Sequence, residues 1–149
     1  MAKRILVPLD QSGEAEVVLE LVADLARSSG ATVRLLHVAP SPRNLVDEEH
    51  RVLAYADQEA ARLGVEALDY LRAVEVRLGG VPVECAVRFG DPLREILLDA
   101  DAFGADLIAV TARPRRPIGR VFRRGVARRL FGRARAPVMV FRPVLEEAA

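Results

Sequence analysis

The sequence is poor in several residue types that mark particular classes of protein. It has one cysteine, Cys85, so an internal disulfide is impossible, and the apolar alternating run around it is typical of a buried thiol. Its two histidines, His37 and His50, have no companions at the spacing of metal ligands. These scarcities predict a protein of a reducing compartment, without a metal site.

Long apolar runs are also missing. None approaches the ~20 residues that a membrane-spanning helix needs. The apolar run at residues 5–9 is too short for a signal peptide and is followed directly by Asp10. We therefore expect a cytoplasmic protein that has no membrane partner.

Charge is distributed very unevenly, although the net charge is only +1. Residues 113–135 contain ten arginines and no acidic residue, so the rest of the chain carries the difference, about −9. Such asymmetry is typical of a local surface for an anion or an acidic partner.

The length and composition fit one globular domain, with 149 residues of which 51% are hydrophobic. No repeat or linker divides the chain, so we expect a single domain over residues 1–149, ending in a short tail at 143–149. Strands are expected at residues 5–9, 32–38, 81–88, 107–110 and 137–141. Helices are expected at about residues 13–29, 47–78, 91–103 and 119–134. This alternation predicts an α/β fold: a single open parallel sheet with helices on both faces.

Local signals place the helix ends. Ser12 is the expected N-cap of the first helix, and Gly30 closes it. Asp91 followed by Pro92 predicts an N-cap and a first-turn proline for the third. The buried stripe of the first helix is expected at Val17, Val18, Leu21, Val22 and Leu25.

Five short motifs, taken in order, resemble the universal stress protein family over nearly the whole chain. They are residues 5–12, 35–38, 90–96, 104–108 and 136–140. The resemblance implies a Rossmann-like fold of the adenine nucleotide alpha hydrolase type, with strand order 3-2-1-4-5. It also implies a stress-response binding protein that is commonly a homodimer.

The resemblance places the dimer interface on the last strand, where two subunits pair antiparallel in many members. That strand comprises Val138, Met139, Val140 and Phe141. The alternative is a short or covered edge strand that pairs with nothing.

Family members that bind ATP resemble Gly-x-x-Gly, nine residues, then Gly-Ser or Gly-Thr. Arg120 within the stretch and Gly125-Val126-Ala127 after it fix the register, in which the four positions are Thr111, Pro114, Arg124 and Gly125, and all four depart from the pattern. A shift of one residue would place Gly125 on the third glycine, but Thr111 and Pro114 would still depart from it. Proline has no N–H to donate to a phosphate, and an arginine at 124 would project into the space of the phosphate. We therefore predict a subtype that lacks the glycine-rich ATP cradle.

Two other positions of the family's nucleotide site are retained. Asp10 stands where binders carry an acid near the ribose and metal, and Val38 where a main-chain group meets the adenine. Each also has a structural interpretation, Asp10 as the polar end of a strand and Val38 as a core residue.

The arginine-rich stretch allows three interpretations. In the first, Arg113, Arg115, Arg116 and Arg124 hold a small phosphorylated ligand by guanidinium groups. In the second, the stretch contacts nucleic acid; we consider this unlikely because its two aromatic residues, Phe122 and Phe131, are expected in the core. In the third, the arginines pair with a partner subunit or with acids of the long helix, namely Asp57, Glu59 and Glu66.

Catalysis is not indicated by any constellation of residues. Cys85 has no evident base, and Ser12 fits a helix cap better than a nucleophile. The function predicted is a binding protein for a small anionic ligand or a protein partner, with no certain cofactor. The alternative is a nucleotide-binding module, for ATP or AMP, that uses arginine side chains in place of the glycine loop.

Overall fold

The structure is a computed structural model that describes residues 2–13, 15–42, 45–46, 48–112 and 125–142. Its elements in chain order are β1 Arg4–Pro8, η1 Ala15–Val18, α1 Leu19–Ser29, β2 Thr32–Ala39, β3 Leu45–Val46, β4 Val52–Ala54, α2 Ala56–Glu75, β5 Val83–Phe89, α3 Pro92–Phe103, β6 Leu107–Thr111, α4 Val126–Arg133 and β7 Val138–Phe141.

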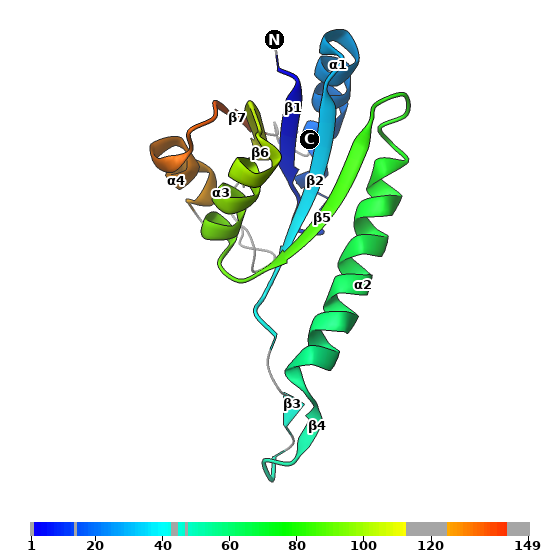
Figure 1. Cartoon of the computed structure of the whole chain (residues 1–149), viewed down its shortest axis with the longest axis vertical. Helices are drawn as coiled ribbons and strands as arrows, with labels where there is room; N and C mark the ends of the chain where they lie inside the picture. Colours follow the sequence, from blue (N-terminus) through cyan, green and yellow to red (C-terminus); the bar gives the residue numbers. More distant parts are fainter. Residues whose placement is uncertain (1, 14, 43–44, 47, 113–124, 143–149) are drawn as a thin grey trace, which may run out of the picture.

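Five of the strands form one parallel sheet in the order β5-β2-β1-β6-β7. Counting only the strands of this sheet, the order is 3-2-1-4-5, which confirms the predicted topology. β1 lies in the centre (Figure 1). Its residues Ile5, Leu6 and Val7 are completely buried, and Pro8 at its end is buried too. Strands buried on both faces read as unbroken apolar runs, as β1 and β6 do.

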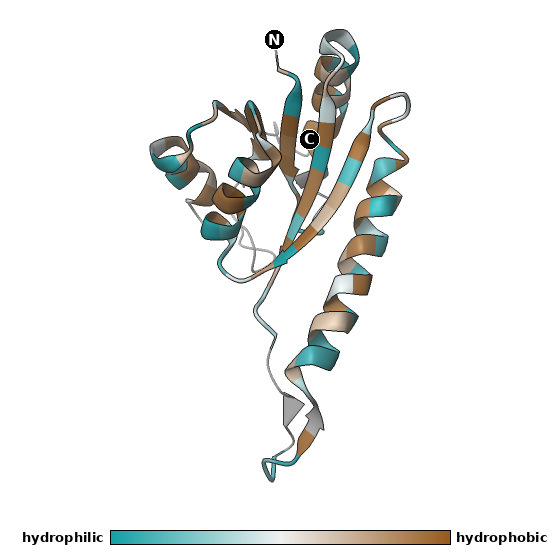
Figure 2. Ribbon diagram, viewed as in Figure 1, coloured by the Kyte–Doolittle hydropathy of each residue, from teal (hydrophilic) through white to brown (hydrophobic). Residues whose placement is uncertain are grey.

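Helices cover both faces of the sheet. α1 and α2 pack on one face, over side chains that include Ile5, Val7 and Val33. α3 and α4 pack on the other face, over Leu6 and Ile108. The two sets alternate along β1 because successive side chains of a strand point to opposite faces, and Figure 2 shows the resulting brown centre of the sheet.

The start of the first helix differs from the prediction. A 3-10 turn, η1, precedes α1, and Val18 rather than Ser12 is the N-cap of α1. Val17 and Leu21 are exposed rather than buried. The buried stripe is shifted to residues of the same spacing, namely Val18, Leu19, Val22, Ala23 and Ala26. A 3-10 turn has fewer residues per turn than an α-helix, so the residues after it face a different direction. The spacing of apolar residues in the sequence does not predict this change.

The prediction of one long helix over residues 47–78 is wrong for the residues before Ala56. Residues 45–46 and 52–54 pair as the antiparallel strands β3 and β4, and α2 begins only at Ala56. Gln58 caps the helix, since its Oε1 accepts a hydrogen bond from the Tyr55 N–H at 3.0 Å. Leu53 falls within the predicted helix but lies in a strand.

α2 ends at Glu75, three residues before the predicted end. The ends of α1 and α3 agree with the predicted signals. Gly30 and Gly104 adopt left-handed conformations behind α1 and α3. The Asp91 side chain accepts a hydrogen bond from the Arg94 N–H at 3.0 Å, as an N-cap does. The last helix, expected from about residue 119, begins only at Val126, because Gly125 before it is left-handed and is its N-cap; residues 119–124 lie outside the described residues. Phe131 in α4 was expected in the core but is 59% exposed.

No helix among the described residues is long and apolar enough to cross a membrane.

Candidate functional site at the carboxyl edge of the sheet

The carboxyl ends of β1 and β6 form the topological switch point of the sheet. From β1 the chain crosses to β2 on one side, while β6 and β7 lie on the other. β1 is paired with β2 over five residue pairs but with β6 over only two, Ile5↔Leu107 and Leu6↔Ile108. In open parallel sheets, ligands bind outside the carboxyl ends of the strands at such a point. The predicted residues Asp10 and Thr111 both lie at this edge.

Asp10 is held in a tight turn directly after β1. Its Oδ1 accepts hydrogen bonds from the Ser12 N–H, at 3.0 Å, and from the Ser12 hydroxyl. Gln11 between them is left-handed, with φ of 67°. This is an Asx turn, in which the carboxylate substitutes for a backbone acceptor. The Ser12 hydroxyl thus takes part in the turn that ends β1.

His37 lies beside this turn and is buried. Its Nδ1–H donates to the Leu9 carbonyl oxygen at 2.8 Å, so in the neutral ring Nε2 is an acceptor, facing the Gln11 amide at 3.5 Å. Burial lowers the pKa of His37, although the Leu9 carbonyl and the charge of Asp10 oppose that shift. The only signal for His37 in the sequence is its position near the end of the second predicted strand.

Val38 is buried within β2, and its side chain belongs to the core under α3. The side chain therefore agrees with the interpretation of Val38 as a core residue. A contact between its main chain and an adenine stays a prediction. The next residue, Ala39, accepts a hydrogen bond from the Gly90 N–H at 2.9 Å, so β2 and the β5–α3 turn end together at this edge. Gly90 has φ of 131°, which favours glycine.

Thr111 and Gly125 flank the stretch in which the family's ATP signature would lie. Thr111 is a buried residue of β6, in register with Phe141. Gly125 is the N-cap of α4, with φ of 101°, and its carbonyl accepts the Arg129 N–H at 2.8 Å. The other predicted ligand residues, Arg113, Arg115, Arg116 and Arg124, lie outside the described residues, as does Pro114.

The arginines that the structure does describe are not paired with the long helix. Glu59 and Glu66 instead form ion pairs with Arg62 of their own helix, α2, at 2.8 and 2.9 Å. α2 covers the sheet face opposite to α4. Within the described part of the chain, the arginines at the end of the basic stretch have no ion pair; they are Arg128, Arg129, Arg133 and Arg135. The interpretation that these arginines pair with acids of the long helix is therefore wrong for these four.

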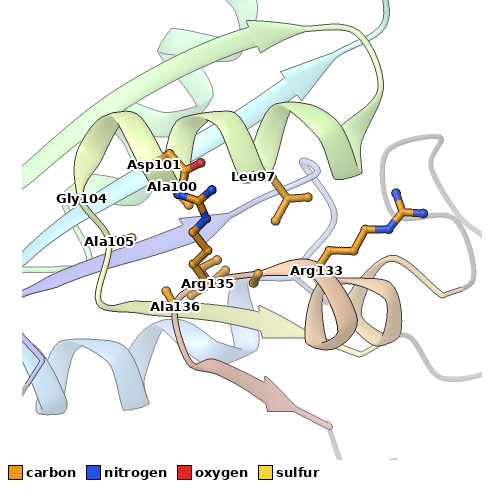
Figure 3. Close-up of a pocket in the computed structure, with 10 residues that line it drawn as sticks. Leu97, Ala100, Asp101, Gly104, Ala105, Arg133, Arg135 and Ala136 are labelled. Atoms are coloured by element: carbon orange, nitrogen blue, oxygen red, sulfur yellow. The ribbon is translucent and has the colours of Figure 1, made fainter.

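Two adjoining hollows of about 330 and 400 Å³ lie between α3 and α4; the first is away from this edge, and the second extends along α3 to Asp91, next to the β5–α3 turn. They share Leu97, Asp101 and Arg133. Figure 3 shows Leu97 projecting from α3 into the first hollow and Arg135 extending across it toward α3. Neither hollow includes Asp10, Val38 or Thr111.

β7 forms one edge of the sheet, as predicted for Val138, Met139, Val140 and Phe141. The carbonyls of Pro137 and Phe141 accept hydrogen bonds from β6 and the residue after it. Since alternate residues of a strand direct their backbone groups to opposite sides, the N–H and C=O groups of Val138 and Val140 point away from β6. The edge is thus open within the described residues, and pairing with a second subunit stays a prediction.

The described residues contain no group of three histidine, cysteine or acidic side chains placed to hold a metal ion. The absence of a metal site stays a prediction.

Comparison with known proteins places this geometry in a family. The profile of the Universal stress protein family matches residues 1–142. Hypothetical protein MJ0577 is similar in structure, with a TM-score of 0.75 and 23% identity over 97% of this chain and 98% of that one. The universal stress protein of Archaeoglobus fulgidus in complex with dAMP has a TM-score of 0.58 and 25% identity, covering 93% of this chain and 96% of that chain.

A universal stress protein family protein of Arabidopsis thaliana with AMP bound is a third similar structure. It has a TM-score of 0.62 and 19% identity, over 95% of this chain and 92% of that chain. No match was found among the curated proteins.

Proposed function

The chain belongs to the universal stress protein family, and we propose that it binds a nucleoside monophosphate or a similar small phosphorylated ligand at the carboxyl edge of its sheet. The proposal adds two features that membership of the family does not by itself imply. The site lacks the glycine-rich cradle for a triphosphate, and arginine side chains hold the phosphate instead.

The geometry of the Asp10 turn carries this proposal. Asp10 is buried at the switch point, and its Oδ1 is oriented by two hydrogen bonds from Ser12. A carboxylate fixed in this way at the end of the first strand suits the hydroxyl groups of a ribose. The dAMP complex of the Archaeoglobus fulgidus protein and the AMP complex of the Arabidopsis thaliana protein support the nucleoside part.

The residues around the missing cradle support the second feature. A glycine-rich loop brings successive main-chain N–H groups together on a phosphate through positive φ, which glycine allows. Thr111 is a buried strand residue with no such conformation. Pro114 and Pro117 lack an N–H, whereas Arg113, Arg115, Arg116 and Arg124 supply forked donors suited to a phosphate.

Isothermal titration of the full chain with AMP, ATP and inorganic phosphate tests the proposal. We expect AMP to bind, and ATP to bind no more than about tenfold tighter, since no cradle rewards the two extra phosphates. Phosphate alone should bind far more weakly because it lacks the nucleoside.

The double variant Arg113→Ala, Arg124→Ala is the decisive comparison. It should weaken AMP and ATP alike, whereas the control Arg72→Ala, an exposed arginine of α2, should weaken neither. ATP binding that is a hundredfold tighter than AMP binding and survives the double variant would show a main-chain cradle and overturn the proposal. Failure of all nucleotides to bind would also overturn it.

A further inference from the structure

The first hollow between α3 and α4 combines an apolar floor with charged side chains at its mouth. Its volume of about 330 Å³ lies within the range of small-molecule pockets, about 300–1,000 Å³. The floor consists of Leu97 and Ile108 together with small residues, namely Ala100, Ala105, Ala134 and Ala136. An aliphatic group of a ligand would be sheltered from water against these side chains.

Two opposite charges face this hollow from different walls. Asp101 belongs to α3, and Arg135 follows α4. Both are exposed, and neither forms an ion pair within the part of the chain that the structure describes. Figure 3 shows the Arg135 side chain extending across the hollow toward α3, whereas Arg133 extends in another direction. The hollow thus presents one carboxylate and one guanidinium on facing walls.

This arrangement suits a ligand that itself carries both charges. A ligand carboxylate would accept hydrogen bonds from the Arg135 guanidinium, and a ligand ammonium would donate to the Asp101 carboxylate; both bonds are charge-assisted. A simple anion would be repelled by Asp101, and a simple cation by Arg135. A direct ion pair between two exposed side chains contributes little to stability, so a ligand that separates them gives up little.

The apolar floor narrows the class of ligand further. In a free α-amino acid the ammonium and the carboxylate are attached to the same carbon, and the side chain leaves that carbon in a third direction. Two charged groups on the walls and an apolar floor between them match these three directions. In a peptide the two charges lie on different residues, so a peptide matches the hollow less well.

We propose that the first hollow binds a free aliphatic α-amino acid, with its carboxylate on Arg135, its ammonium on Asp101 and its side chain against the floor around Leu97. The hollow includes none of Asp10, Val38 and Thr111. The proposal therefore does not depend on the proposed nucleotide site.

Titration of the isotopically labelled full chain with L-leucine, followed by NMR of the backbone amides, provides the test. We expect a dissociation constant of roughly 0.1–1 mM, which suits so small a ligand, and the largest shifts at residues that line the hollow. Isocaproate lacks the ammonium of leucine, and isopentylamine lacks its carboxylate. Each should bind about tenfold or more weakly than L-leucine. L-Serine, which lacks the aliphatic group, should also bind about tenfold more weakly.

Two variants match the two analogues. Asp101→Asn should weaken L-leucine binding by about tenfold but leave isocaproate bound at least as tightly as before. Arg135→Ala should weaken L-leucine binding by a similar factor but leave isopentylamine bound at least as tightly. The control Arg94→Ala removes an exposed arginine that lines the second hollow and not the first, and it should change none of these affinities.

Three outcomes would overturn the proposal. The first is no shift of the amides around the hollow at an L-leucine concentration well above the expected dissociation constant; a lower thermal midpoint of both variants would then show that Asp101 and Arg135 pair with each other. The second is equal affinity of the wild type for L-leucine and isocaproate, which would indicate a site for simple anions. The third is L-leucine binding that neither variant weakens, which would place the ligand elsewhere.

Discussion

Arg34 on β2 and Asp99 on α3 form a two-pronged ion pair across the layer boundary. The Nε and Nη2 atoms of Arg34 donate to Oδ2 and Oδ1 of Asp99 at 2.9 and 3.0 Å. Asp99 is completely buried, and Arg88 on β5 also donates to its Oδ1, at 2.8 Å. The Asp99 carboxylate is the main cause that raises the pKa of Arg88. One helix residue thus connects α3 to two strands of the sheet.

The first prediction concerns the loss of this charge. Asp99→Asn should lower the free energy of unfolding by about 3 kcal/mol, because two guanidinium groups at the boundary lose their buried counter-charge and keep only Glu84 and Glu95, which are more exposed. Urea denaturation followed by circular dichroism measures the change. Asp101→Asn, an exposed position of the same helix, is the matched control and should change it by less than about 0.5 kcal/mol. Equal effects of the two substitutions would contradict the role of the pair.

The second prediction separates the role of Asp10 in the turn with Ser12 from its proposed role in ligand binding. Asp10→Asn keeps an oxygen that can accept the Ser12 N–H but removes the charge. It should therefore change the free energy of unfolding by less than about 1 kcal/mol while weakening AMP binding by roughly tenfold or more. Asp10→Ala should lose both the turn and the ligand. If Asp10→Asn binds AMP like the wild type, the carboxylate has no part in the site.

The third prediction follows from the lowered pKa of His37. The unfolded chain binds a proton at this residue near pH 6.5, whereas the folded chain does so only at lower pH. Above pH 6.5 both states are neutral and no stability is lost. As the pH falls below 6.5, the unfolded state alone gains a proton, so stability should decrease by up to about 1.4 kcal/mol per pH unit until the folded pKa is reached.

The variant His37→Asn tests that assignment. Its amide can still donate to the Leu9 carbonyl but does not titrate, so urea denaturation between pH 7.5 and 5 should show a flatter dependence than the wild type. Identical pH dependence in the two proteins would assign the effect to other groups.

The fourth prediction uses two glycines at the two ends of α4. Gly125→Ala should destabilise the chain by about 1–2 kcal/mol, because φ of 101° is unfavourable for a residue with a Cβ, although nothing obstructs the atom itself. Gly132→Ala should stabilise it by about 0.5–1 kcal/mol, since alanine favours the helix and has open space there. Thermal unfolding of the two variants measures the opposite signs. A shared sign would indicate that α4 is not the helix described.

The fifth prediction concerns the open edge of β7. Val140→Pro removes an N–H that points away from β6, so it should convert a homodimer paired through this edge into a folded monomer. Met139→Pro is the matched comparison, because its N–H faces β6 and its loss should destabilise the sheet itself. Sedimentation and circular dichroism distinguish the two. A Val140→Pro variant that stays dimeric would place the subunit contact elsewhere.

Most of the fold followed from local signals in the sequence. Apolar runs gave the five sheet strands, and caps such as Asp91 and Gly104 gave the helix ends, because these depend on neighbouring residues alone. The errors occurred where two structures share a pattern. Leu53 fits a helical stripe as well as a short strand, and Ser12 fits a helix cap as well as the turn with Asp10.

Sequence alone determined the alternation of strands and helices, the resemblance to the family and the departure from the ATP signature at Thr111 and Gly125, since these depend on residue types in chain order; the strand order followed from that resemblance. Only the tertiary structure decided which polar groups meet. It directed the Ser12 hydroxyl to Asp10, buried Asp99 between two arginines from different strands, and left Phe131 exposed among arginines. Contacts between residues distant in the chain depend on how the layers are rotated against one another, and a helical period is consistent with more than one such rotation.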